Sequence, residues 1–114
     1  MGGKKTILVI DDEVDLTHML KFWLEREGYN AVTAGNGLEG LEKLRNLKPD
    51  LIILDVNMPK MGGIEFYHQI CNGGGKPPFP IFVLTARANR EEVFRDLAVD
   101  GFMSKPFEIG RAHV

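Results

Sequence analysis

The sequence predicts an α/β fold built on a parallel sheet, and the order of its apolar and amphipathic segments leads to this prediction. Short apolar runs recur along the chain, and the stretches between them carry helical spacing. We expect strands at residues 6–10, 31–34, 51–54, 81–84 and, from a weaker signal, 101–103. Strands that alternate with helices form parallel sheets with right-handed crossovers and helices on both faces.

The first helix is expected over residues 14–27. Its apolar stripe consists of Leu16, Met19, Leu20 and Trp23, which fall at helical spacing. Gly28 follows at the position where a helix often ends in a left-handed residue.

The second helix is predicted to start at Asn36, because Glu39 three residues later completes a capping-box pattern. We expect it to bury one side, made of Leu38, Leu41 and Leu44, and Pro49 to end it.

Two further helices are expected in the second half of the chain. One begins near Gly63 and presents Ile64, Tyr67 and Cys71 on one face. Residues 72–80 are rich in Gly and Pro, which predicts a surface connection. Asn89 and Glu92 cap the other helix, which is predicted to bury Val93, Phe94 and Leu97.

Length and composition predict one soluble domain spanning residues 1–114. The formal net charge of -2 and the absence of a basic stripe argue against direct nucleic-acid binding. Cys71 is the only cysteine, so no internal disulfide is possible. The apolar run after the N-terminal lysines is too short for a signal peptide or membrane span, so we expect a cytoplasmic protein without a membrane partner.

Three carboxylates stand where two of the predicted strands end. Asp11 and Asp12 follow the first strand, and Asp55 closes the third. In open parallel sheets, ligands bind beyond the carboxyl ends of the strands. Mg2+ prefers carboxylate oxygens, so the pattern predicts a Mg2+ site next to a nucleophilic aspartate.

Four short phrases make the chain resemble the receiver domain of bacterial two-component response regulators. They are Val-Ile-Asp-Asp-Glu at 9–13, Leu-Asp-Val-Asn-Met-Pro at 54–59 with two glycines at 62–63, Leu-Thr-Ala at 84–86 and Lys-Pro-Phe at 105–107. The resemblance covers nearly the whole chain. It implies a flavodoxin-like (βα)5 three-layer sandwich with strand order 2-1-3-4-5.

By this resemblance, Asp55 is the phosphoacceptor. Asp11, Asp12, Asp55 and the backbone carbonyl of Asn57 would bind Mg2+. Two structural alternatives remain: Asp55 caps the following turn, and Asp12 or Asp15 caps the first helix. Asp11 sits too early to be a helix cap.

The resemblance also assigns Thr85 and Lys105 to the phosphoryl oxygens, where a hydroxyl and an ammonium stabilise charge during transfer. Phe102 matches the switch aromatic, whose ring turns inward when Thr85 moves toward the phosphoryl group. The alternatives are an ordinary strand threonine, a solvated lysine and a phenylalanine buried in both states.

The C-terminal residues 108–114 depart from the family pattern, because they are too few for the usual fifth helix. Gly110 also disfavours a helix there. We therefore expect that helix to be truncated or absent. Its loss would expose apolar surface, including Phe22, and favour self-association.

The resemblance implies a phosphorylation-dependent signalling switch and not a conventional multiple-turnover enzyme. Its partners would be a sensor histidine kinase or phosphotransfer protein and a downstream effector. A phosphate-independent scaffold is one alternative. A phosphohydrolase is disfavoured because Asn57 stands where the general acid would be. A flavin module is disfavoured because Asp11, Asp12 and Glu13 would repel the phosphate.

Overall fold

The computed structural model describes residues 4–55, 63–71, 77–86 and 101–105. Within them the chain forms a parallel sheet in the order β2-β1-β3-β4-β5. The strands are β1 (Thr6–Ile10), β2 (Asn30–Ala34), β3 (Leu51–Asp55), β4 (Ile81–Ala86) and β5 (Gly101–Lys105). The predicted fold class and strand order are confirmed.

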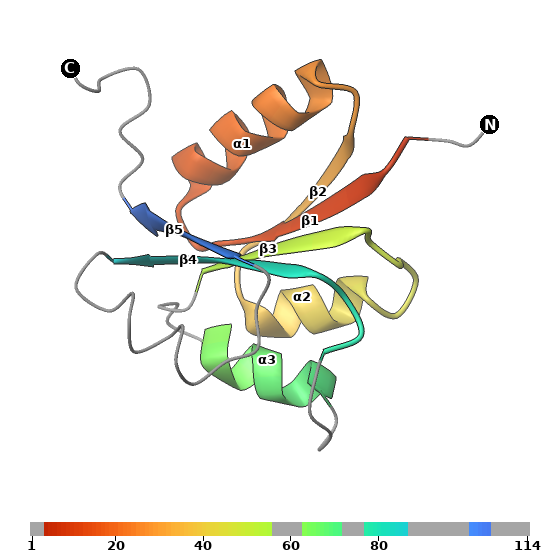
Figure 1. The fold of residues 1–114 in the computed structure, drawn as a ribbon, viewed down its shortest axis with the longest axis vertical. Coiled ribbons are helices and arrows are strands. Elements are labelled where there is room, and N and C mark those ends of the chain that lie inside the picture. The colour runs from red at the N-terminus through yellow and green to blue at the C-terminus, as the bar shows by residue number, and fades with distance from the viewer. Residues whose placement is uncertain (1–3, 56–62, 72–76, 87–100, 106–114) are drawn as a thin grey trace.

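Helices lie on both faces of the sheet (Figure 1). They are α1 (Val14–Arg26), α2 (Gly37–Lys43) and α3 (Gly63–Cys71). α1 covers one face, and α2 and α3 lie together on the other (Figure 1). The predicted helix capped by Asn89 and the expectation of a truncated fifth helix both concern segments outside the described residues.

The core has two parts because successive strand residues point to opposite faces. Leu8 and Ile10 join the cluster that packs against α2 and α3, whereas Ile7 and Val9 join the cluster under α1. The central strands β1 and β3 are buried on both sides, which explains why their sequences are apolar without alternation.

The ends of α1 differ in how well they were predicted. Gly28 has φ +98°, which confirms the left-handed residue expected after the helix, although α1 ends at Arg26. The expectation that Asp12 or Asp15 caps the helix is wrong, because Glu13 is the N-cap and makes no side-chain capping bond. The physical reason is a turn at Asp11: its Oδ1 accepts a hydrogen bond of 2.9 Å from the Glu13 N–H.

The start of α2 follows the prediction. Asn36 is the N-cap, and its Oδ1 accepts from the Glu39 N–H at 2.8 Å. Glu39 in return accepts from the Gly35 N–H at 2.7 Å. The helix ends at Lys43, well before the predicted stop at Pro49.

The buried side of α2 was predicted incorrectly in part. Leu41 and Leu44 pack against the core, but Leu38 is 54% exposed. The buried residues of the helix are Gly37 and Gly40. A Cβ at Gly40 would lie 2.6 Å from Ile10 Cδ1, so the absence of a side chain lets α2 approach β1 closely and turns Leu38 outward.

α3 begins at Gly63, as expected. Tyr67 is buried and Cys71 is partly buried, in agreement with the predicted face, while the Ile64 side chain lies outside the described part of the chain. Phe66, which the predicted face omitted, is fully buried against the sheet. None of the described helices has the length and apolar character that crossing a membrane requires.

Candidate metal centre

Three carboxylates meet at the carboxyl end of the sheet. Asp11 and Asp12 directly follow β1, and Asp55 is the last residue of β3. The two strands are neighbours in parallel register, with Ile10 opposite Leu54, so the residues after each lie side by side. One carboxylate oxygen from each aspartate lies within 4.8 Å of the others.

Burial separates the three aspartates into two kinds. Asp11 is 2% exposed and Asp55 is 1% exposed, whereas Asp12 is open to solvent. A buried carboxylate is costly unless hydrogen bonds or counter-charges compensate it. The cluster therefore combines two enclosed oxygen donors with one solvent-facing donor.

Two hydrogen bonds to backbone groups fix the position of Asp11. Its N–H donates to the Ala34 carbonyl at 3.0 Å, which extends the β1–β2 ladder one residue past the strand. Its Oδ1 accepts from the Glu13 N–H. This second bond was missed at the sequence level, although an aspartate side chain often accepts from the backbone N–H two residues further on and so marks a turn.

The donor set fits Mg2+. Octahedral coordination at roughly 2.0–2.1 Å separates adjacent ligand oxygens by about 2.9 Å and opposite ones by about 4.1 Å. The oxygens of Asp11, Asp12 and Asp55 lie within 4.8 Å of one another, so small side-chain rotations bring them into that range. All three donors are carboxylates, the ligand type that hard cations such as Mg2+ prefer.

The other predicted site residues are located only by their backbone or not at all. Thr85 directly follows Leu84, the register partner of Asp55. Lys105 ends β5 opposite Ala86, and Phe102 pairs with Val83. The side chains of Thr85, Phe102 and Lys105, and all of Asn57, lie outside the described residues.

The structure therefore brings the backbones of Thr85 and Lys105 to the same end of the sheet as the aspartates. Their roles and the metal-binding role of the cluster stay predictions.

Comparison with known sequences points to one family. The model of the response regulator receiver domain matches residues 7–113. The alkaline phosphatase synthesis transcriptional regulatory protein PhoP of Bacillus subtilis is 44% identical over 105 residues, which are 90% of this chain and 43% of PhoP. The DNA-binding response regulator MtrA of Mycobacterium tuberculosis is 35% identical over 107 residues, 92% of this chain and 46% of MtrA. The chain thus spans less than half the length of these relatives.

Solved structures give the same result. The response regulator TrrA of Thermotoga maritima, in complex with Mg2+ and BeF, is 35% identical with a TM-score of 0.78, over 95% of this chain and 92% of that one. The chemotaxis response regulator CheY4 of Vibrio cholerae is 32% identical with a TM-score of 0.81, over 91% of this chain and 88% of that one. Such relatives are signalling proteins and not conventional enzymes.

Proposed function

This chain belongs to the receiver-domain family of two-component response regulators, and within that family of phosphorylation-dependent signalling switches we propose that Asp55 accepts the phosphoryl group. The observation that carries the proposal is the cluster of Asp55 with Asp11 and Asp12 at the end of the central strands. Phosphorylation of an aspartate and Mg2+ binding are typical of the family.

The transfer itself is a displacement at phosphorus. An Asp55 carboxylate oxygen attacks the phosphorus of a phosphohistidine, the new O–P bond forms, and the P–N bond breaks. The imidazole nitrogen leaves with the electron pair of that bond and is free to take up a proton. Since Asp55 is almost fully enclosed and the strand ladder fixes its backbone, the protein contributes mainly positioning.

We assign the Mg2+ ligands to Asp11, Asp12, Asp55 and the backbone carbonyl of Asn57. When bound, Mg2+ would offset the negative charge of the aspartates and of the phosphoryl oxygens. The all-oxygen donor set supports this assignment, as does the Mg2+ in the TrrA complex.

We further propose that Lys105 and Thr85 contact the phosphoryl oxygens and that Phe102 is the switch aromatic. The support is the strand register, which carries β4 and β5 to the same end of the sheet as β3. An ammonium and a hydroxyl at that end would stabilise charge that develops during transfer.

The proposed partners are a sensor histidine kinase or phosphotransfer protein as donor and an effector domain or protein as recipient of the signal, in the cytoplasm. Val14, 63% exposed in the first turn of α1, offers apolar contact area beside the cluster. The net charge of -2 argues against direct DNA binding by this chain itself. The longer relatives are a separate case.

Self-association is a separate part of the proposal. Phe22 is 58% exposed on α1, and the Arg26 guanidinium lies 5.8 Å from its ring centroid. An apolar surface that includes Phe22 would be covered by a second copy. A concentration-independent monomer in sedimentation, with high thermal stability, would contradict this part.

The phosphoacceptor proposal is tested by intact mass after incubation with a small acyl phosphate and Mg2+. We expect one phosphoryl adduct that disappears in Asp55→Asn and when Mg2+ is chelated. Asp50→Asn is the matched control, because Asp50 precedes the opposite end of β3 and bonds the Thr6 N–H instead. It should be phosphorylated like the wild type.

An adduct that persists in Asp55→Asn would refute the assignment of the phosphoacceptor. No adduct in a folded wild-type sample would favour the phosphate-independent scaffold. Circular dichroism of each sample separates these outcomes from loss of the fold.

A further inference from the structure

β2 forms one edge of the described sheet and pairs only with β1. The Asn30 N–H donates to the Lys5 carbonyl at 2.8 Å, and the Ala34 carbonyl accepts from the Asp11 N–H at 3.0 Å. In a parallel ladder the backbone groups of alternate residues face the same neighbour. Ala31 and Thr33 therefore direct their N–H and C=O groups away from the sheet.

The strand itself carries no protection against pairing with another strand. Its sequence, Asn-Ala-Val-Thr-Ala, contains no charge and no proline, and its register with β1 is uninterrupted by a bulge. Edge strands are usually protected by such features. An open groove of about 560 Å3 borders Val32 on the side of α2, so the described helices leave that side of the edge accessible.

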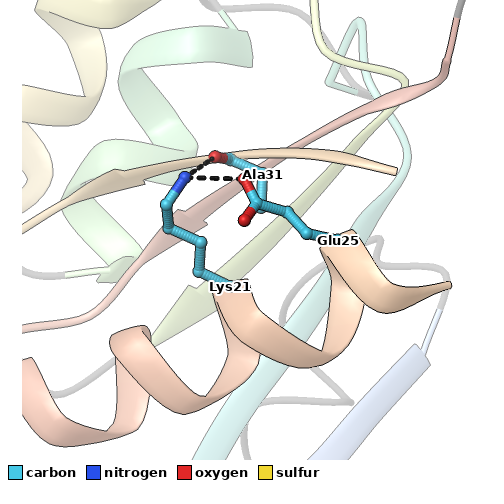
Figure 2. Close-up of polar contacts among 3 residues, drawn as sticks. All are labelled: Lys21, Glu25 and Ala31. Carbon is cyan, nitrogen blue, oxygen red and sulfur yellow. Dashed lines mark hydrogen bonds and ion pairs between the residues drawn. The ribbon is translucent and has the colours of Figure 1, made fainter. Parts of the chain in front are cut away.

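A charge is supplied to this edge by α1. Lys21 Nζ donates to the outward-facing Ala31 carbonyl at 3.0 Å and to Glu25 Oε2 at 2.8 Å (Figure 2). Glu25 lies one turn further along the helix and holds the ammonium over the strand (Figure 2). The two side chains are 43% and 49% exposed, and ion pairs this open to solvent contribute little to stability.

We propose that Lys21, held by Glu25, prevents β2 from pairing edge to edge with a second copy of this chain. Two copies related by a two-fold axis at Val32 would run antiparallel, and the Thr33 N–H of one copy would donate to the Ala31 carbonyl of the other. Lys21 already occupies that carbonyl, and pairing would strip water from its ammonium.

A second copy is the partner that fits this edge best. A two-fold contact uses the same surface twice, so it needs only one exposed edge, and β2 is uncharged along its length. Removing Lys21 would leave two uncharged strands that complement each other through their backbone groups, and Glu25, which is 49% exposed, could then turn into solvent.

The test compares Lys21→Met with the wild type by sedimentation velocity over a range of concentrations. Methionine keeps most of the aliphatic stem and removes the ammonium. We expect the dimer dissociation constant to fall by about ten-fold or more, on the scale of one or two added hydrogen bonds. Lys48→Met makes the same charge change at an exposed lysine outside β2 and should behave as wild type, as should Lys21→Arg.

A second substitution identifies the surface. Thr33→Pro removes an outward N–H at an edge position where proline is tolerated, and it should reverse the association of Lys21→Met. Amide exchange provides a direct readout: the Thr33 N–H should exchange quickly in the wild type and become protected in Lys21→Met at high concentration.

The proposal is overturned if folded Lys21→Met sediments as the wild type does, or if its association is insensitive to Thr33→Pro. Should Lys21→Met not fold, Lys21→Leu provides the same test, because leucine also has no donor for the Ala31 carbonyl. Association through the surface that includes Phe22 would be insensitive to Thr33→Pro, so this substitution distinguishes the two surfaces.

Discussion

The Asp11 carboxylate belongs to the metal cluster and also closes the turn that leads into α1. These roles depend on different properties of the side chain. The turn needs only an oxygen acceptor for the Glu13 N–H, whereas the cluster involves the negative charge. Asparagine keeps the acceptor and removes the charge, and alanine removes both.

We therefore expect Asp11→Asn to be more stable than Asp11→Ala by about 0.5–1.5 kcal/mol, the net contribution of one hydrogen bond. Both variants should lose most of any stabilisation by Mg2+. Urea unfolding with and without Mg2+ measures both effects. Equal stability of the two variants in chelator would show that the turn bond contributes nothing.

Gly40 is the residue at which α2 approaches β1. A Cβ there would lie 2.6 Å from Ile10 Cδ1 and 3.1 Å from Phe66 Cε1, and both of these side chains are fully buried. Alanine is favoured over glycine in a helix by about 1 kcal/mol, but overpacking of a core typically costs about 1–3 kcal/mol. We expect Gly40→Ala to be destabilising, by about 1 kcal/mol in urea unfolding.

A double-mutant cycle tests the cause. Ile10→Val removes the atom that clashes, so in that background Gly40→Ala should cost less, with a coupling of about 1 kcal/mol. Ile53→Val is the matched control, because Ile53 lies on the opposite face of the sheet. Its effect should be additive with Gly40→Ala, and additivity with Ile10→Val as well would reject the steric explanation.

At the level of elements, α2 shows where reasoning from apolar spacing fails. Leu38, Leu41 and Leu44 are three residues apart, which suggested one buried side. The closest approach to the sheet is instead at Gly40, where the helix has no side chain. Leu41 and Leu44 pack against the core, while Leu38 does not. The closeness of two elements depends on the facing residues of both, and a single helix sequence does not contain that information.

We expect Leu38→Lys to change the free energy of unfolding by no more than about 0.5 kcal/mol, as is usual for exposed positions. Leu41→Ala, which removes a partly buried side chain packed on the core, should cost about 1–2 kcal/mol. Thermal or urea unfolding distinguishes the two. A larger loss for Leu38→Lys would mean that Leu38 contributes to the core in solution.

The strands and the carboxylate cluster were predictable because each depends on local signals. Apolar runs mark the strands, and the ends of parallel strands converge, so Asp11, Asp12 and Asp55 were placed together from the sequence alone. The caps were predictable only where a full motif exists, as at Asn36. Before α1, several acidic residues compete, and the sequence does not determine which of them bonds the backbone.

For the whole molecule, we expect repulsion within the carboxylate cluster to oppose folding when no cation is bound. The strand ends bring Asp11, Asp12 and Asp55 together, and two of the three are nearly excluded from water. Like charges at such distances repel, and in the unfolded chain they separate. We therefore expect the folded domain to contain an unfavourable interaction that a divalent cation would relieve.

A ligand that binds only the folded state stabilises it by RT ln(1 + [L]/Kd). We expect the melting temperature to rise with Mg2+ concentration, with the stability increasing by about 1.4 kcal/mol per ten-fold increase in Mg2+ above its Kd. Asp11→Asn and Asp55→Asn should reduce this increase and should themselves melt higher than the wild type in chelator, because each removes one repelling charge.

General salt screening also weakens the repulsion, so the control is NaCl at matched ionic strength. Screening acts weakly on buried charges, and Asp11 and Asp55 are buried, so NaCl should stabilise much less than Mg2+ does. Equal effects of the two salts would mean that the cluster does not bind the cation specifically. If Mg2+ stabilises neither the wild type nor Asp50→Asn, the protein itself compensates the negative charge of the carboxylates. The metal would then not contribute to the stability of the fold.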